Sequence, residues 1–130
     1  MSDAPMMIDL RGEDASAELS EEARATATRL YRAIRIRDER LGTDLFADPA
    51  WNILLDLTIA HGRRMLSVSA ACLGARSAHA TAMRYLTALI KRGIVCREAD
   101  PTDGRRNFVK LTALGVHRME RILTDFRFQT

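Results

Sequence analysis

The sequence has 130 residues, of which 47% are apolar and 28% are charged, a size and composition typical of one globular domain. No apolar run approaches the roughly 18 to 20 residues that a membrane-spanning helix needs, and residues 1–10 lack the basic start and apolar core of a secretion signal. Cys72 and Cys96 form no CxxC pair and no histidine lies at zinc-ligand spacing from them, which excludes a disulfide framework or a structural zinc as the organising principle. We therefore expect a cytoplasmic protein that uses no metal or cofactor.

The net charge of +3 conceals a division along the chain. Residues 1–22 carry seven acidic side chains and one arginine, whereas residues 23–130 carry 19 basic and 10 acidic side chains. Eighteen of the 20 cations are arginine, whose guanidinium donates paired hydrogen bonds to phosphates and to guanine edges. Nucleic acid is therefore the first partner to expect, and an anionic membrane surface the second.

The N-terminal part divides into a tail and a helix. Residues 1–18 have neither helix nor strand periodicity and are predicted to form an acidic flexible tail. A helix is predicted from Ser20 to about residue 41, because Ser20 can cap it and two glutamates follow in its first turn. Its apolar stripe comprises Ala23, Ala27, Leu30, Ile34 and Leu41. The six arginines from Arg24 to Arg40 are expected to form a solvated outer face in preference to contacting DNA.

A second helix is predicted to begin at Asp48-Pro49. An N-cap residue followed by proline at the first helical position is a strong start signal, and the helix should end near Gly62 with Trp51 in the core. Met65 and Leu66 are then expected to form a very short strand.

Two further helices are predicted in close succession. Ser67 can cap a helix from Val68 to Ala75, in which Cys72 and Leu73 are expected to face inward, and Ser77 can cap another over residues 78–92 that stops at Gly93. The second of these repeats apolar residues on one face, at Ala82, Leu86 and Leu89. The spacing describes a helix-turn-helix, which is weak evidence when taken alone.

The following segment predicts a β-hairpin. Residues 94–99 read as a strand, residues 100–104 are dense in turn formers, and residues 107–111 alternate as a second strand. Arg105 and Arg106 would then lie at or near the tip. A hairpin directly after the second helix is the winged form of the motif. Thr112 is expected to cap a last helix whose apolar side comprises Val116, Met119, Ile122, Leu123 and Phe126.

At the hairpin the sequence resembles the MarR family of bacterial transcriptional regulators. The positions that match the D-x-x-D-x-R and L-T-x-x-G patterns of that family are Asp100, Asp103, Arg105, Leu111, Thr112 and Gly115. Leu89 and residues 91–95 match the L-x-x-x-G-L-V that joins the family's recognition helix to its wing, and the resemblance covers residues 49–116. Only 18 residues follow Thr112, whereas family members usually add one or two long C-terminal helices.

The resemblance implies a mainly α fold with a small β-hairpin. In this fold a single winged helix-turn-helix domain over residues 19–130 is flanked by N-terminal (about 20–41) and C-terminal (about 113–128) dimerisation helices. It also implies that the recognition helix 78–92 enters the major groove while the wing 97–110 approaches the minor groove, usually as a twofold homodimer on a palindromic site.

The expected DNA contacts follow from the faces of that helix. With Ala82, Leu86 and Leu89 inward, the residues that face away are Ala80, Thr81, Arg84 and Ala88, with His79 and Met83 at the edges. Arg84 can donate two bonds to guanine, Thr81 can meet a phosphate or a thymine methyl, and His79 can reach a base edge or a phosphate. The alternative is that Arg84 and His79 are ordinary surface residues.

The remaining candidates lie on the hairpin and around the helix pair. Arg105 and Arg106 suit a narrow minor groove, where the negative potential is strongest. By resemblance Asp103 positions Arg105 through a salt bridge, and the alternative is a turn-forming aspartate. Weaker candidates for contact with the DNA backbone are Arg76, Ser77 and Lys91.

The sequence therefore predicts a sequence-specific regulator that binds double-stranded DNA as a homodimer, and no enzyme. Its three histidines lie in different elements, and it has no nucleophile motif and no glycine-rich phosphate loop. Cys72 is predicted to be a small core residue, although the resemblance allows an oxidant-sensing role. The alternative function is a protein-interaction module that docks through the acidic tail and the first helix, with a membrane-surface binder third. The sequence identifies no small-molecule effector.

Overall fold

The computed structural model describes residues 18–129, with side chains as far as residue 125, so the tail predicted for residues 1–18 lies outside it except for Glu18. This part contains five α-helices and one three-stranded antiparallel sheet. In chain order the elements are α2 (Glu21–Leu41), the 3-10 turn η1 (Thr43–Leu45), α3 (Pro49–Ala60), β1 (Leu66–Ser67), α4 (Val68–Gly74), α5 (His79–Lys91), β2 (Val95–Asp100), β3 (Asp103–Leu111) and α6 (Ala113–Gln129). The predicted fold class, a winged helix-turn-helix flanked by terminal helices, is confirmed.

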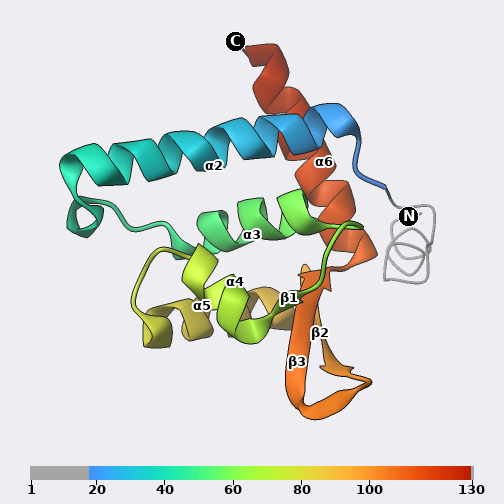
Figure 1. Ribbon diagram of the computed structural model, residues 1–130. Helices are drawn as coiled ribbons and strands as arrows, with labels where there is room; N and C mark the ends of the chain where they lie inside the picture. Colours follow the sequence, from blue (N-terminus) through green and yellow to red (C-terminus); the bar gives the residue numbers. More distant parts are fainter. Residues whose placement is uncertain (1–17, 130) are drawn as a thin grey trace.

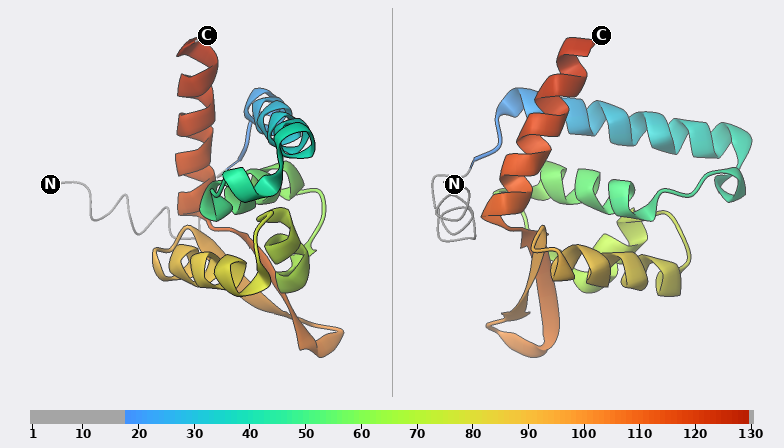
Figure 2. Two further views of the ribbon diagram at one scale, coloured as in Figure 1. Left: turned by 90° about the vertical axis from the view of Figure 1, so that its left-hand side faces the viewer. Right: turned by 180° about the vertical axis from the view of Figure 1, so that it is seen from behind.

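The helices are arranged in layers (Figure 1). α3 lies between α2 on one side and the pair α4 and α5 on the other, and the hairpin of β2 and β3 projects away from α2. α6 crosses the N-terminal end of α2, and its own C-terminal end extends past α2 (Figure 2). Within residues 18–129 no helix is long and apolar enough to cross a membrane.

Three of the predicted helix caps are confirmed. Ser20 Oγ accepts a hydrogen bond from the backbone N–H of Ala23 at 3.0 Å, and Ser67 Oγ accepts one from Ala70 at 3.1 Å. The hydroxyl of Thr112 accepts from the N–H of residue 115 at 3.0 Å, which fixes the start of α6. Each of these caps satisfies a backbone donor that a helix start leaves without a partner.

The predicted start of α3 is confirmed, because Asp48 occupies the N-cap position and Pro49 the first helical position, although the Asp48 side chain makes no capping bond. The cap predicted for the next long helix was wrong. The helix α5 begins at His79 with Ala78 in the N-cap position, so Ser77 stands one residue too early to cap it. The recognition helix therefore starts without a side-chain cap.

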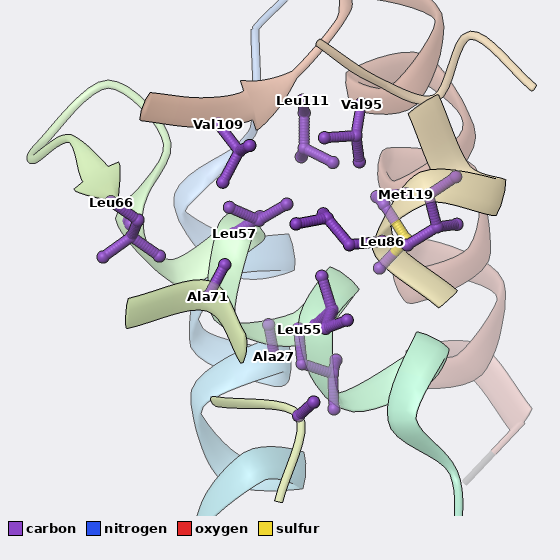
Figure 3. Close-up of a cluster of buried hydrophobic side chains, with 14 of the residues drawn as sticks. Ala27, Leu55, Leu57, Leu66, Ala71, Leu86, Val95, Val109, Leu111 and Met119 are labelled. Atoms are coloured by element: carbon purple, nitrogen blue, oxygen red, sulfur yellow. The ribbon is translucent and has the colours of Figure 1, made fainter. Parts of the chain in front are cut away.

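The core is built where α3, α5, α6 and the sheet meet (Figure 3). Leu57 of α3 lies beside Leu86 of α5, Leu55 of α3 lies near Ala27 of α2, and the sheet adds side chains of β2 and β3. The side chains that are almost completely buried include Ile53, Leu55, Leu57, Leu86, Val95, Val109, Leu111, Val116, Met119 and Leu123. Burying one such side chain stabilises the fold by about 1.5 to 3 kcal/mol.

Several residues expected in the core are not buried. Leu73 is 82% exposed although its neighbour Cys72 is buried, because adjacent helical residues point about 100° apart. Leu41 and Ile122 are also exposed, the first at the outer end of α2 and the second beside the buried stripe of α6. Trp51 is only half-buried. The last residue of the predicted α6 stripe, Phe126, lies outside the described side chains.

The hairpin is longer and tighter than predicted. β3 begins at Asp103, so the turn proper is residues 101–102 and not residues 100–104. Asp100 pairs with Asp103, but the next pair of the ladder is Ala99 with Asn107. Residues 104–106 therefore form an irregular bulge on β3 near the tip, and this bulge carries both wing arginines.

Gly115 shows why the start of α6 lacks a side chain. A Cβ added there would overlap the backbone carbonyl oxygen of Ile94, and the backbone N–H of Thr112 donates to that same carbonyl at 3.0 Å. The first turn of α6 is thus packed directly against the backbone of Ile94, the residue that leads from α5 into β2.

We predict that Gly115→Ala destabilises the protein by about 1 to 3 kcal/mol, because the methyl group cannot be accommodated without a backbone shift. Urea unfolding followed by circular dichroism measures the change. Gly104→Ala is the matched control, since no heavy atom lies within 4 Å of a Cβ added there, and its unfolding midpoint should stay close to that of the wild type. A stabilised Gly115→Ala protein, as expected for a glycine in an open helix, would contradict this packing.

Candidate nucleic-acid interface

The turn between α4 and α5 is hydrogen-bonded to both α2 and α3. Tyr31 Oη on α2 donates a hydrogen bond to the carbonyl of Gly74 at 2.7 Å. Asn52 Nδ2 on α3 donates to the carbonyl of Ala75 at 3.0 Å, in a buried position. Carbonyls at the end of α4 that would otherwise lack a helical partner are satisfied in this way.

The third bond to this turn is an ion pair. Asp38 Oδ2 on α2 accepts a hydrogen bond from Arg76 Nε at 2.8 Å, and the Asp38 side chain is almost fully buried. Arg76 has φ +57°, the left-handed conformation that residues other than glycine seldom adopt. Tyr31, Asp38 and Asn52 are called the turn clamp below, because together they fix three consecutive residues before the recognition helix.

The Asp38 carboxylate is held in its charged form. The hydrogen bond from Arg76 holds its pKa below the usual value, assisted by Arg37, whose Nη2 lies 2.8 Å from Asp38 Oδ1. The Arg37 guanidinium also stacks on Phe46, 3.8 Å from the ring centroid. The sequence predicted Arg76 as a DNA contact, whereas the structure commits its Nε to Asp38.

The recognition helix α5 divides into two faces. Ala82, Leu86 and Leu89 are buried, as expected. Ala80, Arg84, Ala88 and His79 are exposed on the outer side, and Thr81 is half-buried. Among the residues whose side chains are described, no ion pair involves Arg84, His79 or Lys91. The outer face of α5 thus presents the small side chains Ala80 and Ala88, the ring of Tyr85, and a cation that none of the described carboxylates neutralises.

The N-terminus of α5 is an additional feature that sequence reasoning missed. Because Ala78 occupies the N-cap position, the first-turn N–H groups of α5 have no side-chain acceptor. The neighbouring Ser77 Oγ is buried and has no hydrogen-bond partner among the described residues. N–H groups at a helix N-terminus favour an anion, which a phosphate oxygen can supply.

Each wing arginine is paired with a different aspartate. Arg105 Nε lies 3.4 Å from Asp103 Oδ1, which also accepts the Arg105 backbone N–H at 3.1 Å. This is the ion pair that the resemblance led us to expect, and both of its side chains are exposed to solvent.

The second pair, Asp100 with Arg106, was missed by sequence reasoning. Arg106 Nε donates to Asp100 Oδ2 at 3.2 Å, while Thr102 donates both its N–H and its hydroxyl to Asp100 Oδ1 at 2.8 Å. The bonds from Thr102 are the main reason that the pKa of Asp100 is lowered. The Asp-Pro-Thr sequence is typical of such a turn and could have indicated the aspartate's role.

Cys72 is a buried residue between the two helices of the motif. Its thiol donates to Met83 Sδ at 3.3 Å, and burial raises the pKa of the thiol. A raised pKa disfavours the reactive thiolate at neutral pH, so the position of Cys72 fits a packing role.

The comparisons with known proteins found similar solved structures but no matching family model and no matching curated protein. No protein-family model matches the chain, and no curated protein matches it either. Among solved structures, a mutant form of MepR from S. aureus has a TM-score of 0.54 at 20% identity over 78% of this chain and 77% of its own. S. aureus MepR in a DNA-binding conformation has a TM-score of 0.53 at 22% identity, over 78% of this chain and 79% of its own. The chain therefore has a MarR-like winged-helix fold.

The turn clamp predicts a pH-dependent loss of stability. Asp38→Asn should lower the free energy of unfolding at pH 7 by about 1 to 3 kcal/mol, because Arg76 loses a charged partner. Since the pKa of Asp38 is lowered in the folded protein, its contribution is present above the unfolded pKa of about 3.9 and is lost as the pH falls below it. Urea titrations at a series of pH values should therefore show wild type and variant converging on acidification.

The control for this series is Glu39→Gln, which makes the same charge change at an exposed neighbouring position on α2. Its stability should match that of the wild type at every pH. An Asp38→Asn difference that is as large at strongly acidic pH as at neutral pH, or one no larger than that of Glu39→Gln, would contradict the role given to the ion pair.

Proposed function

We propose that the protein binds double-stranded DNA with sequence preference and acts as a transcriptional regulator, with α5 in the major groove and the hairpin at the minor groove. The observation that carries the proposal is the outer face of α5, where Arg84 has no acidic partner among the described residues, lies 5.7 Å from the centroid of the Tyr85 ring, and is flanked one turn away on each side by Ala80 and Ala88. The likeness to a MepR structure described as being in a DNA-binding conformation supports it.

The proposed contacts of α5 fall into two kinds. Arg84 donates two bonds to guanine O6 and N7, and Ala80 and Ala88 allow the helix to approach the groove floor. Thr81 and His79 contact a phosphate or a base edge, and Lys91 contacts a phosphate. The uncapped N–H groups at the start of α5 bind a further phosphate oxygen. Arg76 and Ser77 take no part in base readout, since the first is bonded to Asp38 and the Oγ of the second is buried.

The alternative, a winged helix that binds proteins, requires a different outer face. An interaction helix exposes large apolar side chains, and on α5 only Tyr85 is both large and exposed. Other large exposed apolar side chains lie on different elements, such as Leu73 on α4 and Ile36 on α2. The composition of α5 therefore favours DNA.

The test is selection of bound duplexes from a random DNA pool, followed by titration of the selected sequence. Arg84→Ala should weaken binding to the selected duplex by about 1 to 3 kcal/mol and reduce its preference over random DNA, because a base contact is lost. Wild-type affinity should also fall steeply with salt concentration, since counterions return to the phosphates.

Arg32→Ala is the matched control, because Arg32 is also exposed but lies on α2, which α3 separates from the recognition helix (Figure 1). It should leave both affinities nearly unchanged. Equal losses of Arg84→Ala on selected and random DNA would remove Arg84 from base readout. If Arg32→Ala lowered DNA affinity as much as Arg84→Ala does, the result would indicate that α2 contributes to the DNA-binding surface.

We also propose that the protein is a homodimer held by α2 and α6. Twofold pairing sets two recognition helices about one helical turn apart, roughly 34 Å, so that both half-sites contribute to affinity. The structure reduces the surface expected for this contact, because Val116, Met119 and Leu123 are buried within the chain's own core. The apolar side chains that remain exposed on these helices include Ile36, Leu41 and Ile122.

The expected mass by light scattering behind a sizing column is twice the chain mass of 14.6 kDa at micromolar concentration. Ile122→Asp should give a folded monomer that binds its DNA weakly, because it places a charge in the proposed contact. The matched control is Leu45→Asp, because Leu45 is also an exposed apolar residue but lies on η1, outside α2 and α6, and this variant should stay dimeric. A wild-type chain that remains monomeric at high micromolar concentration and protects a single half-site would contradict the dimer.

A further inference from the structure

We propose that the cavity at the C-terminal end of α3 binds a small organic carboxylate, whose apolar body lies between α3 and the sheet and whose charge meets His61 and Arg64. The cavity has a volume of about 280 Å³ and is lined by residues of α3, β1, β3 and the segment between α3 and β1. None of the residues that line it belongs to α5, so the site does not depend on the proposed DNA binding.

The walls of the cavity are apolar. Its buried lining comprises Leu57 and Ala60 of α3, Leu66 of β1 and Val109 of β3. Figure 3 shows Leu57, Leu66 and Val109 on their three separate elements. Walls of this kind favour an apolar ligand body over a bare inorganic anion. The volume lies at the small end of the range for ligand pockets, which is roughly 300 to 1,000 Å³, and therefore favours a short chain over a nucleotide or a peptide.

Basic side chains complete the lining. His61, Arg64 and Lys110 border the cavity, and none of the described residues that line it carries a carboxylate. Lys110 Nζ lies 3.2 Å from Glu98 Oε2, whereas Arg64 Nη2 lies 4.0 Å from Asp56 Oδ1, which is too far for a hydrogen bond. Arg64 therefore keeps its paired donors, which suit a carboxylate.

The His61 ring is a second uncommitted group. Among the described residues no hydrogen bond involves this ring. Burial lowers the pKa of His61, and the nearby charges of Arg24 and Lys110 lower it further. A carboxylate beside the ring would oppose these charges and favour the protonated imidazole. The ring can then donate to the ligand.

The end of α3 does not repel an anion from this site, although a helix C-terminus carries partial negative charge. Arg24 Nη1 donates to the carbonyls of Thr58 and Ile59 at 3.1 and 2.8 Å. The carbonyl of Ala60 accepts from the N–H groups of residues 63 and 64 at 2.9 and 3.0 Å. The last carbonyls of α3 are thus bonded, and the charge of Arg24 opposes the helix dipole beside His61.

The experiment titrates ¹⁵N-labelled protein with hexanoate, and in parallel with hexan-1-ol and acetate. Hexanoate should give saturable shifts in residues 57–66 and 109–110, and should bind about tenfold or more tightly than either control, because the alcohol lacks the charge and acetate lacks the chain. Saturation with hexanoate should also raise the pKa of His61. The ring signals of His117, which is exposed on α6, should not respond.

Two neighbouring arginines provide a matched pair of variants. Arg64→Gln should weaken hexanoate binding by about tenfold, because a charged hydrogen bond is lost. Arg63→Gln is the control, since Arg63 is similarly exposed but pairs with Glu21 at 2.6 Å and does not line the cavity. It should keep the wild-type affinity. Urea unfolding of both variants checks that they fold.

Four results would overturn the proposal. Hexan-1-ol that binds as tightly as hexanoate would make the cavity apolar without preference for an anion. Shifts confined to residues 30–37 and 48–52 would place hexanoate in the separate cavity between α2 and α3. Equal losses with Arg63→Gln and Arg64→Gln would indicate a general effect of charge. The absence of saturable shifts with hexanoate would remove the site altogether.

Discussion

The position of the recognition helix depends on the bonds that fix the turn before it. α5 has no side-chain cap, so its start is set by the turn clamp, in which the buried Asp38 holds Arg76 in a left-handed conformation. A carboxylate that is taken out of water is stable only with its charge partner in place, and removing that partner is strongly unfavourable. The same turn is bonded to Tyr31 on α2 and to Asn52 on α3. Both α2 and α3 are therefore bonded to the turn that leads directly into the first turn of α5.

Local sequence patterns predicted the helices and strands. They did not predict the contacts between residues that are far apart in the chain. The caps at Ser20, Ser67 and Thr112 and the buried stripe of α5 follow from spacing over three to seven residues, which a sequence displays directly. Asp38 lies in a run of charged residues and pairs with a partner 38 positions away, so nothing local distinguishes it from its neighbour Glu39. Leu73 was misplaced because a two-turn helix has too few residues to reveal which face is inward.

Basic composition indicated a polyanionic partner but did not say which arginines are available to one. Arg24 Nη1 donates to the carbonyls of Thr58 and Ile59 at 3.1 and 2.8 Å, at the end of α3. Arg37 and Arg76 are bonded to Asp38. Arg24 and Arg76 thus link α2 to other parts of the fold, and Arg37 supports the Asp38 carboxylate on α2 itself. The candidate interface consists of other arginines, and only the folded chain shows which they are. The resemblance to MarR-like wings likewise indicated Asp103 and Arg105, whereas the better-fixed pair is Asp100 and Arg106.

In the proposed function the outer face of α5 and the tip of the hairpin meet DNA while α2 does not. The most direct measurement is a titration of ¹⁵N-labelled protein with the duplex selected from a random pool, followed amide by amide. We expect shifts concentrated in residues 78–84 and 103–106, with the exposed arginine face of α2 unchanged. Shifts concentrated on residues 29–40, with α5 and the hairpin unaffected, would contradict the claim.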